Sequence, residues 1–196
     1  MKESILIIAN GPSVLNHKIG KKIDQFPVIA RINNYRIEGF EDYIGSKTNI
    51  WLNGNNQGLN KRDSLPKEVI VLIPPVILNQ KGESIHKLIH KRLNINQKKY
   101  GLVSYEKMLQ FEQMCKPTRL TTGMNSICWA MDIYDEVFIH GFDFFQNSKG
   151  HYFDGKIIDF FLKIGLKKKG KKHDLAKERN FFISLIKHGK IKKLVE

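Results

Sequence analysis

The ten residues 4–13, which read SILIIANGPS, decide the fold. The first six form a short, continuous and mainly apolar run, which is typical of a strand buried on both faces of a parallel sheet. The last four combine Asn, Gly, Pro and Ser, the residue types that mark a turn. The sequence therefore predicts a buried first strand that ends in a polar loop.

The rest of the chain alternates between strand and helix patterns. Further strands are predicted at residues 27–32, 49–52, 69–73 and 136–140, and helices at 83–93, 105–115, 123–133 and about 174–187. We expect an α/β fold with a single Rossmann-like, mostly parallel sheet and helices on both faces. We expect one domain over residues 1–196, with a mobile basic loop at about 148–172.

Composition and charge narrow the function classes. The chain has 196 residues, is 41% hydrophobic and carries a net charge of +14, which excludes collagen-like, disulfide-rich and disordered proteins. Residues 156–196 hold thirteen basic and four acidic residues, or +9 of that charge. This region is suited to nucleic acid, an anionic lipid surface or a phosphorylated glycan. A merely solvated basic face is the alternative.

The sequence also suggests a cellular setting. The N-terminal apolar run is too short for a signal peptide, and no apolar stretch approaches the roughly 20 residues that span a bilayer. Two cysteines are present, Cys115 and Cys128. We expect reduced thiols and a cytoplasmic protein, with any membrane contact peripheral.

Two polar segments stand where a parallel sheet binds ligands, beyond the strand ends and at helix N-termini. In the first, Asn10 offers an amide and Gly11 permits close approach of the backbone. The second, residues 119–123, groups a cation, two hydroxyls and a glycine before a helix. Neither is a Rossmann or Walker motif. Taken alone, an ordinary turn and an ordinary helix cap account for most such sequences.

Metal and serine chemistry have little support. His86 and His90 are four residues apart, but Lys87 stands where a zincin has Glu, and neither Asp-x-Asp nor Gly-x-Ser-x-Gly occurs. We therefore predict no metal site. His151 and His173 are the better candidates for proton transfer, because each is flanked by polar sequence and an exposed histidine titrates near neutral pH. The alternative is that both are ordinary surface histidines.

Four motifs in sequence order resemble the sialyl-motifs of glycosyltransferase family 29. Residues 6–13, 23–34 and 39–48 resemble the long motif, and residues 120–123 with 135–142 resemble the short one. The third motif is matched by His151 and Tyr152, and the very short one by His173 with Glu178. Bacterial family 42 sialyltransferases offer a further likeness at residues 10–13, 119–123 and 141–147. The disulfide between the long and short motifs of the animal enzymes has no counterpart here.

The resemblance implies a sialyltransferase-type fold, a variant of the GT-A type, and a metal-independent inverting glycosyltransferase without a cofactor. Its donor would be CMP-sialic acid or a related CMP-ulosonic acid such as CMP-Kdo. Its acceptor would be a glycan or glycolipid, in bacterial-type surface polysaccharide or lipooligosaccharide.

The resemblance also implies roles for individual residues. His173 would be the general base, and His151 with Tyr152 would donate hydrogen bonds to the departing phosphate. Donor binding would fall to the strand-end and helix-start residues Asn10, Gly11, Ser13, Asn33, Thr121, Thr122 and Gly123. Supporting roles would fall to Arg119, Asp143 and Glu178, with Glu178 orienting the helix that follows His173.

A different class of function stays open: a basic module on the same fold that binds nucleic acid or an anionic surface without catalysis. Base stacking needs aromatic side chains interleaved with basic ones. The C-terminal aromatic residues instead occur as the adjacent pairs Phe160-Phe161 and Phe181-Phe182, a spacing typical of a helix core. We therefore expect no nucleic-acid partner, and contact with an anionic membrane only through the C-terminal lysines.

Overall fold

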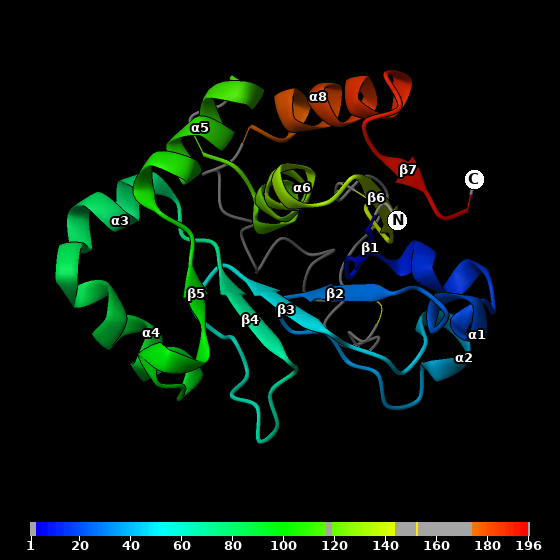
Figure 1. Ribbon diagram of the computed structural model, residues 1–196, viewed down its shortest axis with the longest axis horizontal. Coiled ribbons are helices and arrows are strands. Elements are labelled where there is room, and N and C mark those ends of the chain that lie inside the picture. The colour runs from blue at the N-terminus through cyan, green and yellow to red at the C-terminus, as the bar shows by residue number, and fades with distance from the viewer. Residues whose placement is uncertain (1–2, 117–118, 144–151, 153–173, 196) are drawn as a thin grey trace, which may run out of the picture.

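A computed structural model describes residues 3–116, 119–143, 152 and 174–195 (Figure 1). Its centre is a seven-stranded sheet in the order β5-β4-β3-β2-β1-β6-β7, in which every strand pair is parallel. The strands are β1 (Ser4–Ile8), β2 (Val28–Ile32), β3 (Ile50–Asn53), β4 (Glu68–Val71), β5 (Gly101–Leu102), β6 (Glu136–His140) and β7 (Lys192–Lys193). The predicted α/β fold with a parallel sheet is confirmed.

The strand predicted first in the sequence lies near the middle of the sheet. Ile5 of β1 pairs with Val28 of β2 on one side and with Val137 of β6 on the other. From Ile5 to Ile8 every residue of β1 is buried. A strand with helices over both faces needs apolar side chains in both directions, which explains the continuous apolar run.

The helices agree with the sequence patterns and add some shorter elements. The four predicted helices correspond to α4 (Ile85–Leu93), α5 (Tyr105–Cys115), α6 (Thr122–Ile133) and α8 (Leu175–Lys187). The shorter elements are η1 (Pro12–Asn16), α1 (Gly20–Ile23), α2 (Glu41–Ile44), α3 (Pro75–Lys81), η2 (Gly82–Ser84) and η3 (Gln97–Lys99). The strand predicted to run up to the prolines at 74 and 75 ends earlier, at Val71. Pro75 begins α3, because the first turn of a helix needs no N–H from that residue.

Helices cover both faces of the sheet. On one face, α5, α6 and α8 pack over Ile5 and Ile7, and Figure 1 shows these three helices together on one side of the strands. On the other face, η1, α1 and α2 cover Leu6 and Ile8, while α4 covers the part of the sheet around Trp51. The prediction of a sheet covered on both faces is confirmed.

Three other expectations meet the structure only in part. The basic loop predicted at about 148–172 lies outside the described residues, apart from Tyr152. Cys115 and Cys128 are both buried and free. Within the described ranges, no helix is long and apolar enough to cross a membrane.

Candidate functional site

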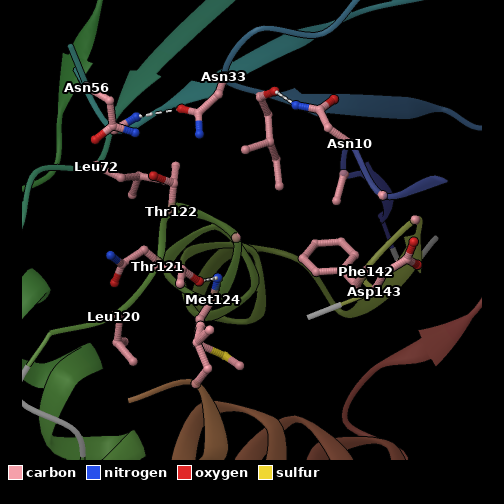
Figure 2. Close-up of a pocket in the computed structure, with 18 of the residues that line it drawn as sticks. Asn10, Asn33, Asn56, Leu72, Leu120, Thr121, Thr122, Met124, Phe142 and Asp143 are labelled. Atoms are coloured by element: carbon pink, nitrogen blue, oxygen red, sulfur yellow. Dashed lines mark hydrogen bonds between the residues drawn. The ribbon is translucent and has the colours of Figure 1, made fainter. Parts of the chain in front are cut away.

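A cavity of about 350 Å³ opens where the carboxyl ends of the central strands meet the N-terminus of α6 (Figure 2). Its volume lies within the range of ligand sites, about 300–1,000 Å³. Residues at or just after the strand ends form most of the wall, residues 119–125 around the start of α6 form most of the remainder, and Leu175 of α8 completes it. The lining residues are Ala9, Asn10, Gly11, Ile32, Asn33, Gly54, Asn56, Leu72, Pro74, Arg119, Leu120, Thr121, Thr122, Gly123, Met124, Asn125, Gly141, Phe142, Asp143 and Leu175.

Asn10 lies just after β1, and only the nitrogen of its side-chain amide is hydrogen-bonded within the described residues. Its Nδ2 donates to the carbonyl of Ile32, at 2.9 Å, which ties β1 to β2. Its Oδ1 is buried and has no hydrogen-bond partner among the described residues. Because a buried amide oxygen without a partner is costly, this atom is suited to a ligand O–H or N–H.

Gly11 and Ser13 hold the first turn against the loop after β6. A Cβ added to Gly11 would lie 2.5 Å from the Asp143 carboxylate and from the Gly141 carbonyl oxygen, so only glycine fits. The Ser13 N–H donates to Asp143 Oδ2 at 3.0 Å, and the Ser13 hydroxyl donates to Asp143 Oδ1. Ser13 is thus engaged beside the cavity and is absent from its lining, so its predicted contact with the donor stays a prediction. Asp143 lines the cavity and holds Ser13 beside it, and its predicted supporting role in donor binding stays a prediction.

Asn33 follows β2 and shapes the next part of the wall. It adopts a left-handed backbone conformation with φ of 50°, which Asn tolerates better than most residues. Its Oδ1 accepts a hydrogen bond from the Gly54 N–H at 3.1 Å, and its carbonyl accepts one from the Trp51 indole at 2.8 Å. Asn33 therefore joins β2 to the end of β3 while lining the cavity.

Thr121 caps α6 and is fully engaged within the protein. Its Oγ1 accepts a hydrogen bond from the Met124 N–H at 3.2 Å. Its own N–H and hydroxyl donate to the two carboxylate oxygens of Glu178, at 2.8 and 2.7 Å. Glu178 lies on α8 and has no exposed surface. Burial raises the pKa of this carboxyl, and the hydrogen bonds from Thr121 oppose that rise.

Thr122 and Gly123 present the start of α6 to the cavity. The first N–H groups of a helix have no acceptor within the helix, and they carry the positive end of its dipole. Thr121 caps the N–H of Met124, and the N–H groups of Thr122 and Gly123 have no acceptor within the described part of the chain, so they are available to a ligand. Arg119 also lines the cavity. Helix N-termini commonly bind anions, so an anionic group suits this end of the cavity.

Tyr152 lies close to the site but directs its hydroxyl elsewhere. The hydroxyl donates to the carbonyl of Arg36 and accepts from the Arg36 N–H at 2.9 Å. The ring is buried edge-to-face against Phe40, with centroids 4.9 Å apart. The predicted hydrogen bond from Tyr152 to a phosphate stays a prediction, and it would require the contacts with Arg36 to break.

The two predicted catalytic histidines, His151 and His173, lie outside the described residues. Their sequence neighbours contact the site. The N–H of Tyr152 donates to the carbonyl of Asn10 at 3.1 Å, and Leu175 lines the cavity.

Several lining residues went unpredicted, among them Gly54, Asn56, Leu72, Asn125 and Phe142. Gly54 and Asn56 belong to the polar run that follows β3, so the strand-end rule applied to Asn10 would have found them. Asn125 sits in mainly apolar sequence and gives no local signal, whereas Phe142 lies within the matched residues 135–142 but was not singled out there. Their place in the cavity depends on how α6 and the end of β6 meet.

Beneath this wall, at the end of β6, His140 is buried and neutral. Its pKa is lowered to about 4, mainly by burial and to a lesser extent by His17, while Asp143 opposes the shift. Within the described ranges, no group of three His, Cys, Asp or Glu side chains is arranged to hold a metal ion.

The model of glycosyltransferase family 29 (sialyltransferase) matches residues 4–190. The chain belongs to this family. It is 26% identical to the rat type 2 lactosamine alpha-2,3-sialyltransferase, over 93% of this chain and 61% of that protein. It is 23% identical to the bovine lactosylceramide alpha-2,3-sialyltransferase, over 96% of this chain and 51% of the relative. The chain thus spans about half to three fifths of the length of these relatives.

The fold agrees with the same family. A crystal structure of a mammalian sialyltransferase in complex with Gal-beta-1-3GalNAc-ortho-nitrophenol superposes with a TM-score of 0.71 at 19% identity. The match covers 98% of this chain and 69% of that one. The predicted sialyltransferase-type fold is confirmed.

Proposed function

We propose that the protein transfers sialic acid from CMP-sialic acid to a glycan hydroxyl, with inversion and without a metal ion. The observation that carries the proposal is the first turn of α6, which presents uncommitted N–H groups to a cavity ringed by asparagine amides. Membership of glycosyltransferase family 29 supports the same chemistry.

The anionic end of the cavity suits a nucleoside monophosphate leaving group. Such a group carries less charge than a diphosphate, so N–H donors and a cation can stabilise it as the glycosidic bond breaks. In this proposal the N–H groups of Thr122 and Gly123, the Thr122 hydroxyl and Arg119 hold the phosphate. Asn10 and Asn33 hold the nucleoside beside it.

Proton transfer is assigned to His173, and stabilisation of the leaving group to His151. His173 takes the proton of the acceptor hydroxyl as that oxygen attacks the anomeric carbon, and His151 donates a hydrogen bond to the departing phosphate. Two contacts support these roles: Leu175 lines the cavity two positions after His173, and Tyr152, next to His151, is bonded to Asn10.

The proposal also specifies which sugar is transferred and which molecule accepts it. Sialic acid is favoured because the family relatives are sialyltransferases, and Kdo is the alternative ulosonic acid. We propose a glycan or glycolipid of the cell surface as the acceptor, in surface polysaccharide or lipooligosaccharide.

We further propose that the protein is cytoplasmic and binds anionic membrane peripherally through its C-terminal lysines. On α8 and after it, the exposed basic residues include Lys177, Arg179, Lys187, Lys190 and Lys193. Binding to anionic vesicles should weaken steeply from low to physiological salt, because salt screens the attraction. Equal binding to neutral and anionic vesicles would contradict this part of the proposal.

Thermal unfolding with and without CMP tests the central assignment. A nucleotide at 100 times its Kd stabilises the folded state by about 2.7 kcal/mol, so CMP should raise the Tm by several degrees, and UMP and GMP should raise it less. A Tm that responds to heparin but not to CMP would instead support the non-catalytic polyanion-binding alternative.

A further inference from the structure

Asn125 is a buried polar residue for which the proposed chemistry has no role. It is the fourth residue of α6, its side chain is 1% exposed, and it lines the cavity. Its Oδ1 is buried and has no hydrogen-bond partner within the described part of the chain. Leaving such a group unpaired lowers stability, whereas an apolar residue of similar size would not.

The neighbouring residue shows how α6 accommodates a buried polar group that has only a structural role. Ser126 has no exposed surface, and its hydroxyl donates to the carbonyl of Thr122 at 2.7 Å. Such a bond to the preceding turn is the usual solution for a serine within a helix. The amide oxygen of Asn125 has no comparable partner among the described residues, so this atom is available to a ligand in the cavity.

A second amide reaches the same cavity from another element. Asn10 at the end of β1 is 8% exposed, and its Oδ1 also lacks a partner among the described residues. Two unpartnered amide oxygens, one from the sheet and one from α6, therefore line one cavity. Amide oxygens accept hydrogen bonds, so both atoms are suited to a ligand group that donates them. An ionised phosphate has no hydrogen to donate, so the phosphate is not that group.

The position of Asn125 along α6 limits which ligand group it can meet. It lies two residues beyond Gly123, about 3 Å along the helix axis and about 200° around it, and both residues line the same cavity. A side chain this close to the phosphate-binding turn reaches groups only a few bonds from the phosphorus atom. In a CMP-sugar these are the hydroxyls of the two sugars that the phosphate joins, and a hydroxyl both donates and accepts, as an amide does.

We propose that Asn125 is a specificity-determining residue of the donor site, whose carboxamide hydrogen-bonds a hydroxyl of a sugar directly attached to the phosphate. This inference rests on the proposed function. The contacted sugar is either the ribose or the transferred sugar, and these two contacts predict different changes in ligand affinity.

The experiment measures the Kd of CMP, 2′-deoxy-CMP, 3′-deoxy-CMP and CMP-sialic acid, together with the Tm without ligand, for the wild type and Asn125→Leu. Ser126→Ala is the matched control for a buried polar residue of the same helix turn, and it should leave all four affinities within about twofold. Asn125→Leu should raise the ligand-free Tm by about 2–4 °C, because it removes an unpaired buried amide.

Contact with the ribose predicts that Asn125→Leu binds CMP about 10-fold more weakly, the effect of one hydrogen bond. Removing the contacted ribose hydroxyl should then weaken binding to the wild type equally and have no further effect in the variant. Contact with the transferred sugar predicts unchanged CMP binding and about 10-fold weaker binding of CMP-sialic acid.

If the wild type binds CMP and Asn125→Leu binds CMP and CMP-sialic acid within twofold of it, the inference is wrong and the proposed function stands. If the wild type does not bind CMP, both are wrong. Asn125→Asp keeps the shape but adds a negative charge near the phosphate, so it should weaken CMP binding at least 10-fold. Unchanged binding by this second variant would also overturn the inference.

Discussion

The carboxylate of Glu178 accepts hydrogen bonds from both the N–H and the hydroxyl of Thr121, although the two residues are 57 positions apart. Glu178 lies in the first turns of α8 and Thr121 caps α6. The contact fixes the start of α6, where the anionic end of the cavity is formed, relative to the segment that follows His173. In this way Glu178 supports the site through Thr121.

Replacing Thr121 should lower stability, whereas replacing Thr122 should affect ligand binding. Thr121→Val removes the helix cap and one donor to a buried carboxylate, so the free energy of unfolding should fall by about 2–4 kcal/mol. Thr122→Val is the matched control. Its free energy of unfolding should change by about 0.5 kcal/mol or less, whereas its binding of CMP should weaken. Urea denaturation and CMP titration measure both. Equal stability of the two variants would show that the Glu178 contact contributes nothing.

Two glycines at the cavity should respond differently to alanine. Gly11 has an ordinary φ of −69°, so the cost of Gly11→Ala is steric: its Cβ would meet the Asp143 carboxylate at 2.5 Å. We expect a loss of about 1–3 kcal/mol, the usual cost of overpacking. In Gly123→Ala the new Cβ would lie 3.4 Å from the Phe142 ring, an ordinary contact, and a helix gains stability from alanine. Denaturation curves showing Gly11→Ala to be as stable as Gly123→Ala would refute this packing.

His140 should make the protein sensitive to mild acid. Its pKa is about 4 in the folded protein, against about 6.5 in an unfolded chain. Below pH 6.5 the unfolded state binds a proton that the folded state does not, so stability is lost as the pH falls towards 4. At pH 5 the loss relative to pH 7.5 should be about 2 kcal/mol. His140→Gln should lose correspondingly less stability over the same range of pH in urea titrations, and an identical loss would contradict the burial of a neutral His140.

The sequence was informative where structure depends on local pattern. Continuous apolar runs located β1 and β6, and the hydroxyl before a helix located the Thr121 cap. The two-residue strands β5 and β7 were missed, because two residues carry no periodicity and their pairing is set by neighbouring strands. Likewise α3 was missed, since its two leading prolines were interpreted only as the end of a strand.

Within the site, long-range contacts were beyond the reach of the sequence. The strand-end and helix-start rules singled out Asn10 and Gly123, and the family resemblance singled out Asn33; all three line the cavity. They did not reveal that Ser13 would be engaged by Asp143, because that contact joins residues 130 positions apart. The engagement of Tyr152 by Arg36 was missed for the same reason, at a separation of 116 positions.

The catalytic assignment of His173 predicts a separation of rate from affinity. His173→Ala should lower the rate of transfer by about 10²-fold or more, because a general base acts mainly in the transition state. Its Kd for CMP should stay within a few-fold of the wild type. Steady-state kinetics with CMP titration measure both quantities. Wild-type transfer by His173→Ala would make His151 the next candidate for the base.

The most direct test of the account is the release of CMP from CMP-sialic acid in the presence of EDTA, with CMP-Kdo as the comparison donor. We predict that CMP is released faster from CMP-sialic acid than from CMP-Kdo and that EDTA does not change the rate. Thr122→Val should slow the release. A strict requirement for Mg²⁺ or Mn²⁺, or the absence of CMP release from both donors under conditions where the protein is folded, would contradict it.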